Sequence, residues 1–429
     1  AASVSLAGCL AVMSTQKMLL TNAFWSLASH LLSRGTLMLV AIILARALPT
    51  SDFAAYSYFQ MTVAMIGAYA ALGLGTTASR FFAEVGHEGA DGPPKPLGAL
   101  CSISILVSLV VGLAIYAVPA SWLSANLAVP QWLMATGVAV TALGVVPGGA
   151  ILGLEQYRAA TVISFVHGAV LITATVIAAR NQAPVVAMTA FVLGTFVQAA
   201  GQFAVVLRTV GWHRISERFL FTRKDTAQIM HFAGPMFLVT LMSASGSWIV
   251  GRIILREVEG THNFALYSIG LHWYSLALLL PGMVSRVVLP RLVRASGKTL
   301  EQSKEIVRDG SLLSLAAGGL VAVTAILLGP YIGAMYGTNY SIGRLFIAAY
   351  MAAALMSAPT NTIGNAILAK DGQVTWLKNT AAWFAVILAV AFAASAHGFE
   401  QWTGSIAHAA AGATLLTLAF VSCRKRHLI

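Results

Sequence analysis

The sequence has 429 residues, of which 58% are hydrophobic and only 9% are charged, and this composition excludes a water-soluble globular fold of that size. Long apolar runs, such as the one from Ser311 to Gly337, favour membrane-spanning helices over the short alternating strands of a membrane barrel. The net charge of +12 fits loops that face an anionic lipid surface better than it fits nucleic-acid binding. We therefore expect an all-α polytopic membrane protein with no nucleic-acid partner. No metal site or cofactor is expected, because the three cysteines lack metal-ligand spacing.

Apolar windows bounded by glycine, proline and charged residues predict about twelve transmembrane helices. The predicted spans are 22–45, 53–75, 97–117, 131–152, 160–179, 185–207, 228–251, 264–285, 311–329, 342–366, 375–396 and 402–422. This pattern divides the chain into an N-terminal segment 1–21, a first six-helix half 22–207, a basic linker 208–227, a second six-helix half 228–422 and a basic tail 423–429.

The distribution of lysine and arginine predicts the orientation of these spans. With the N-terminus inside the cell, most of the 26 basic residues fall in cytoplasmic loops. The outer ends carry only Arg46, Arg180, Arg252, Arg256 and Arg344, which leaves Arg34 alone within a span. Both termini are therefore expected to be cytoplasmic. The outer loops are short, so they offer no room for a catalytic domain outside the membrane.

Two short repeats indicate that the halves are duplicated. "FAAYS" at Phe53 opens the second span and "FALYS" at Phe264 opens the eighth, and an arginine follows each phenylalanine by 27 residues, at Arg80 and Arg291. Two six-helix halves that both enter the membrane from the cytoplasm imply a pseudo-twofold axis along the membrane normal, with a central cavity between them.

The acidic residues all fall in loops or at helix ends, whereas one arginine enters the membrane. Arg34 precedes Arg46 by twelve residues, which at about 1.5 Å per residue places it about 18 Å deeper, near the middle of the bilayer. An arginine at that depth costs about 2.5–3.5 kcal/mol and should face a cavity or a partner. No acidic residue in a neighbouring span can neutralise it. We therefore expect an anionic ligand, and cation exporters that bury carboxylates are disfavoured.

Several other basic residues are candidates for the same cavity. They are His30, one helical turn before Arg34, together with His272, Arg252, Arg80, Arg286 and Arg291. Arginine suits phosphate because its guanidinium group forms paired hydrogen bonds with phosphate oxygens and stays charged. For Arg80, Arg286 and Arg291 the alternative is a role as cytoplasmic anchors that only fix the topology.

The chain resembles a known family in several stretches. These are "NAFWSLASHLLSRGTLMLVAIILARALPTSDFAAYSYFQ", "ALGLGTTASRFFAE" and "ILGLEQYR", taken with the two six-helix halves. They resemble the polysaccharide transporter family of lipid-linked oligosaccharide flippases, the Wzx type, within the MOP (MATE-like) superfamily. Lipid II flippases, which are relatives, carry two more helices, and their first-helix arginines have a counterpart only in Arg34.

The resemblance implies a bacterial inner-membrane protein that moves an undecaprenyl-pyrophosphate-linked oligosaccharide from the inner to the outer leaflet by alternating access. Such a protein would serve O-antigen or exopolysaccharide synthesis, with membrane lipids, a polysaccharide polymerase and a chain-length regulator as further partners. Two alternatives remain at this stage. One is a multidrug exporter of the same fold, and the other is a membrane enzyme of the pathway, such as a polymerase, ligase or acyltransferase.

Overall fold

The computed structural model describes residues 2–70, 73–88, 97–216, 223–285, 288, 300–340, 342–370 and 372–426, and most of them are helical. Within these ranges, eleven helices are long and apolar enough to cross a membrane. A bent pair, Thr50–Ala70 with Leu74–Glu84, brings the number of spans to twelve. The predicted all-α polytopic class is confirmed.

The first half of the chain forms helices that pack mainly on one another. These are α1 (Ala2–Ala47), α2 (Thr50–Ala70), α3 (Leu74–Glu88), α4 (Leu97–Ala117), α5 (Ala120–Ser124), α6 (Gln131–Leu143), α7 (Val145–Gly153), α8 (Tyr157–Arg180), α9 (Pro184–Val210) and α10 (Trp212–Ser216).

The second half repeats this arrangement in a second bundle. Its helices are α11 (Arg223–Ile254), α12 (Gly260–Ala277), α14 (Leu300–Leu327), α15 (Gly329–Tyr336), α16 (Arg344–Ser357), α17 (Thr360–Leu368), α18 (Gln373–Ala396) and α19 (Thr403–Lys425).

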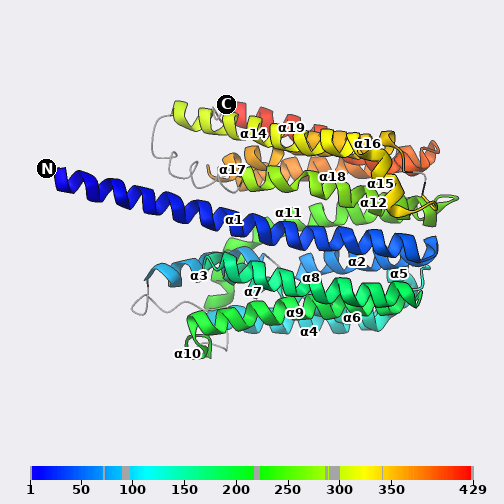
Figure 1. Cartoon of the computed structure of the whole chain (residues 1–429), viewed down its shortest axis with the longest axis horizontal. Helices are drawn as coiled ribbons and strands as arrows, with labels where there is room; N and C mark the ends of the chain where they lie inside the picture. The colour runs from blue at the N-terminus through cyan, green and yellow to red at the C-terminus, as the bar shows by residue number, and fades with distance from the viewer. Residues whose placement is uncertain are drawn as a thin grey trace.

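The two bundles lie side by side, and both chain termini lie at the same end of the molecule (Figure 1). We call this end the terminal side and the other end the opposite side. α1 begins at Ala2 and projects past the bundle on the terminal side, so the segment predicted to precede the first span is helical and continuous with it. α11 and α14 likewise begin before the predicted spans, at Arg223 and Leu300.

The second and fourth spans of each half are broken. Between α2 and α3 the chain bends by 56°, next to Gly73, whose φ of +72° is a left-handed conformation that glycine adopts without strain. The other three breaks each lie close to a proline, which has no N–H to donate to the preceding turn. The prolines are Pro147 in α7, Pro281 after α12, and Pro359 between α16 and α17.

The buried apolar side chains form three separate clusters. The largest cluster joins both halves near the opposite side. It includes the parts of α1, α2, α11, α12 and α16 that lie nearest that side, with Phe53, Phe264 and Tyr350 fully buried. On the terminal side each half has a cluster of its own, one around Phe82 and Ile151 and the other around Ile367 and Cys423. Among the described residues, the halves are therefore joined by a common core toward the opposite side and have separate cores on the terminal side.

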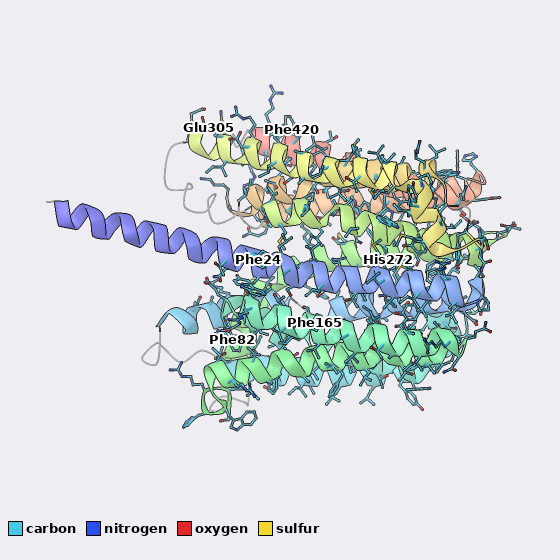
Figure 2. All side chains as sticks on the ribbon, in the orientation of Figure 1. Phe24, Phe82, Phe165, His272, Glu305 and Phe420 are labelled. Atoms are coloured by element: carbon cyan, nitrogen blue, oxygen red, sulfur yellow. The ribbon has the colours of Figure 1, made fainter. Side chains whose placement is uncertain are left out.

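The outside of the bundle carries many large apolar side chains, as expected of a surface that faces lipid. Phe24, Phe165 and Phe420 are exposed and come from three different helices (Figure 2).

Candidate functional site

Two adjoining cavities lie between the halves at mid-depth. The first has a volume of about 260 Å³ and is lined by side chains from α1, α2, α9 and α12. The second has a volume of about 290 Å³ and is lined by α1, by α12 with its continuation 279–285, and by α17. Arg34 and Ser275 line both cavities, so these two residues mark the junction. The second cavity lies nearer the terminal side, because its residues precede Arg34 along α1 and follow Ser275 along the second-half span.

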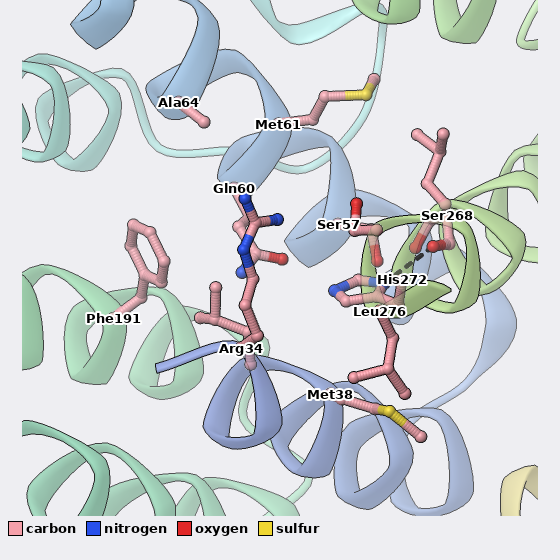
Figure 3. A pocket seen from close by; sticks show the side chains of 13 residues that line it. Arg34, Met38, Ser57, Gln60, Met61, Ala64, Phe191, Ser268, His272 and Leu276 are labelled. Carbon is pink, nitrogen blue, oxygen red and sulfur yellow. Dashed lines mark hydrogen bonds between the residues drawn. The ribbon is translucent and has the colours of Figure 1, made fainter. Parts of the chain in front are cut away.

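Arg34 projects from α1 toward Gln60 of α2 (Figure 3). Its side chain is exposed to the cavity. Among the residues that the structure describes, Arg34 forms no ion pair. The first cavity wall around it is mostly apolar, with Met38, Met61 and Phe191 among its members. A permanent positive charge in such surroundings favours an anionic ligand.

His272 reaches the same cavity from α12. Its Nδ1 atom lies 2.7 Å from the carbonyl oxygen of Ser268, and because a carbonyl can only accept, Nδ1 carries the hydrogen (Figure 3). The other ring nitrogen, Nε2, faces the cavity. The site therefore combines a fixed cation with an imidazole whose orientation the backbone sets.

The second cavity contains more polar groups. His30 lies one turn before Arg34 on α1, and Asn361 lines the same cavity from the first turn of α17, together with Gly282. Leu278, Gly282 and Asn361 all lie next to the proline-associated breaks of the second half. Broken helices at corresponding positions of two repeats are the usual walls of a transporter binding site.

Three of the seven predicted site residues are thus brought together: Arg34, His30 and His272. Arg252 lines neither cavity. Its Nη1 donates to the Tyr58 hydroxyl at 3.2 Å, and its guanidinium carbon lies 5.5 Å from the centre of the Trp248 ring. Arg252 therefore connects α11 to α2, across the two halves.

Arg80 also lies outside both cavities, on α3, where its Nε is 3.1 Å from Glu84 Oε1. Arg286 and Arg291 lie outside the described residues. Trp273 and Tyr274, which follow His272 in the sequence, line neither cavity. Trp273 donates to Tyr336 at 3.2 Å and Tyr274 donates to Ser357 at 2.9 Å.

The apolar cavity wall and Ser275 were not predicted. A stripe of methionine, leucine and phenylalanine at helical spacing looks the same whether it faces a cavity, a core or lipid. The helix breaks did leave a signal, because Pro281 and Pro359 fall inside otherwise apolar spans.

Comparison with known proteins places these features in a family. Residues 19–296 match the polysaccharide biosynthesis protein family. The EPS I polysaccharide export inner membrane protein EpsE of Ralstonia nicotianae is 24% identical over 346 residues, covering 75% of this chain and 74% of the relative.

Among solved structures, the fold is similar to the inward-facing conformation of a multidrug resistance MATE transporter of the MOP superfamily. The TM-score is 0.74 at 14% identity, and the match covers 92% of this chain and 94% of that one. A MOP-superfamily transporter from Pyrococcus furiosus, described as having a binding pocket of reverse polarity, gives a TM-score of 0.71 at 13% identity, with 94% of each chain covered. This chain belongs to the polysaccharide biosynthesis protein family and has the fold of the MOP-superfamily transporters.

Proposed function

We propose that this protein is a flippase of the bacterial inner membrane that moves an undecaprenyl-pyrophosphate-linked oligosaccharide from the inner to the outer leaflet, for O-antigen or exopolysaccharide synthesis. The observation that carries the proposal is the position of Arg34, at the junction of two cavities between the halves. Membership of a polysaccharide biosynthesis family and the export role given to its Ralstonia relative support it.

The chemistry of such a substrate matches the cavity. A pyrophosphate group is prohibitively costly to move through hydrocarbon unless its charge is compensated. The guanidinium of Arg34 supplies charge-assisted hydrogen bonds to phosphate oxygens, and the polar groups of His30, Asn361 and Gln60 suit sugar hydroxyls. The lipid tail can remain in the bilayer throughout.

Alternating access supplies the movement. The common apolar core joins the halves toward the opposite side, while on the terminal side each half has its own cluster. This is the arrangement of a transporter whose cavity opens on the terminal side. With the termini in the cytoplasm, as the basic loops favour, the cavity would face the leaflet on which lipid-linked units are made. The exported unit would then pass to a polymerase and a chain-length regulator.

The test is to delete the gene and to follow complete lipid-linked repeat units by mass spectrometry, with an impermeant reagent reporting which leaflet holds them. The proposal expects complete units to accumulate on the cytoplasmic leaflet. Units that reach the outer leaflet normally but fail to polymerise would overturn it in favour of an enzyme. Undisturbed polysaccharide together with lost resistance to cationic drugs would overturn it in favour of a multidrug exporter.

A further inference from the structure

We propose that His272 takes up a proton when a phosphate group binds at Arg34, so that the cavity binds the anion and the proton together. This inference rests on the function proposed above and adds a proton-linked step to the same site. The proton comes from the water of the open cavity, and no covalent bond is formed or broken.

The geometry of His272 leaves one ring atom for this role. Nδ1 already donates to the Ser268 carbonyl oxygen, so the incoming proton can bind only at Nε2. Among the described residues Nε2 has no hydrogen-bond partner, and Figure 3 shows the ring facing the cavity that Arg34 lines. A protonated Nε2 would donate directly to a bound phosphate oxygen.

His408 shows what a histidine without this role looks like. It makes the same backbone contact, with Nδ1 2.8 Å from the Gly404 carbonyl oxygen, but its Nε2 lies 3.2 Å from the Ser247 hydroxyl. Its side chain is only 2% exposed and lines neither cavity. Both of its ring nitrogens are therefore used, whereas one nitrogen of His272 is available to a ligand.

The surroundings of His272 contain few groups that titrate or carry charge. α1 contributes Arg34, with His30 in the adjoining cavity, and none of the lining residues is a carboxylate. From α2 and α9 the cavity neighbours are uncharged: Ser57, Gln60 and Phe191. The titratable groups of α16 and α19, Tyr350 and His408, are buried and pack on Gly270 and Tyr274 of α12.

The charge balance then depends on the ligand. In the empty cavity a second positive charge beside Arg34 is unfavourable, whereas a bound anion makes the same charge favourable. Histidine is the side chain that most readily gains or loses a proton near neutral pH, so a reversal of this kind can change its protonation. By linkage, the affinity for the anion must increase as the pH falls, by at most about tenfold per pH unit for one proton.

A short synthetic glycolipid, farnesyl-pyrophosphoryl-N-acetylglucosamine, is a suitable probe. Its pyrophosphate is a diester, so its own charge is constant around neutral pH. We would titrate it into the purified full-length protein by calorimetry, in two buffers of different ionisation enthalpy and between about pH 6 and about pH 8. We expect proton uptake by the wild type and tighter binding at the lower pH.

Two substitutions complete the experiment. His272→Gln keeps a neutral hydrogen-bond donor but cannot gain a proton, so it should bind the probe as the wild type does at high pH, without uptake and without pH dependence. His408→Gln is the matched control and should keep the full uptake. Size-exclusion profiles and melting temperatures establish that each variant is folded.

Each outcome has a distinct meaning. If the wild type binds the probe with the same affinity at every pH and releases the same heat in both buffers, the inference is wrong and the proposed function stands. Undiminished uptake in His272→Gln would also overturn it. If the wild type does not bind the probe at any pH, the proposed function fails and the inference fails with it. A wild type that binds the probe without proton uptake overturns the inference even if a variant does not fold.

Discussion

Replacing Arg34 with glutamine should reduce ligand affinity without reducing stability. Charge-assisted hydrogen bonds contribute about 1.5–3 kcal/mol, so losing those from Arg34 to a pyrophosphate should weaken binding roughly 10- to 150-fold. The folded protein should lose nothing comparable, because Arg34 has no ion pair among the described residues and its side chain is exposed to the cavity. Removing a charge from mid-membrane relieves an insertion cost of about 2.5–3.5 kcal/mol.

The assay therefore has two readouts, probe affinity and melting temperature, supplemented by complementation of a deletion strain. Arg34→Lys should give intermediate affinity, since it keeps the charge but loses the paired hydrogen bonds of the guanidinium group. Arg46→Gln, at the far end of the same helix, should leave affinity unchanged. Wild-type export by Arg34→Gln would show that the cavity needs no cation. A variant that fails to fold would show instead that Arg34 is structural.

Three further substitutions test other parts of the structure. Gly270→Ala would place a Cβ against the buried Tyr350 ring, closer than van der Waals contact allows, so unfolding should become easier by about 1–3 kcal/mol, measured as a lower melting temperature. Arg252→Gln removes the hydrogen bond to Tyr58 that joins the halves, and with it the cation–π contact that Arg252 makes with Trp248 of its own helix. The loss is about 1 kcal/mol in all, so a cysteine in the cavity should be labelled about fivefold faster from the opposite side. Burial raises the pKa of the Glu257 carboxyl, in the loop before α12, above its value in the unfolded state. The protonated carboxyl therefore favours the folded state in acid, and this stability is lost as the pH rises through the unfolded-state and folded-state pKa values. Glu257→Gln should raise the melting temperature at neutral pH, and the gain should disappear in acid.

Each of these experiments has a control in the same chain. Gly319→Ala adds a Cβ with nothing within 4 Å and should not destabilise. The labelling experiment uses Ser57→Cys in the first cavity, and unchanged labelling would mean that the Arg252 contact does not hold the halves together. For Glu257, a difference from glutamine that persists unchanged at low pH would mean that protonation is not its cause.

The sequence was sufficient for the number and order of spans because hydrocarbon requires about 20 apolar residues per crossing, and that requirement is local. It also predicted that Arg34, His30 and His272 line the cavity, since a charged or imidazole group inside an apolar run is easy to recognise. It did not separate these from Arg252, whose hydrogen-bond partner Tyr58 lies 194 residues away in the sequence. Pairings of that kind depend on how the halves pack, which periodicity along one helix does not encode.

The lone charge of Arg34 also has an electrical consequence. In an alternating-access cycle the cavity is connected first to one side of the membrane and then to the other. The charge of Arg34, which lines the cavity, therefore moves through the membrane potential although Arg34 stays on α1. Each elementary charge moved in this way changes the energy by about 2.3 kcal/mol per 100 mV. A potential that is negative inside would draw the empty, positively charged carrier back toward the cytoplasm. A bound pyrophosphate cancels or reverses that charge, so the same potential would no longer hold the loaded carrier there.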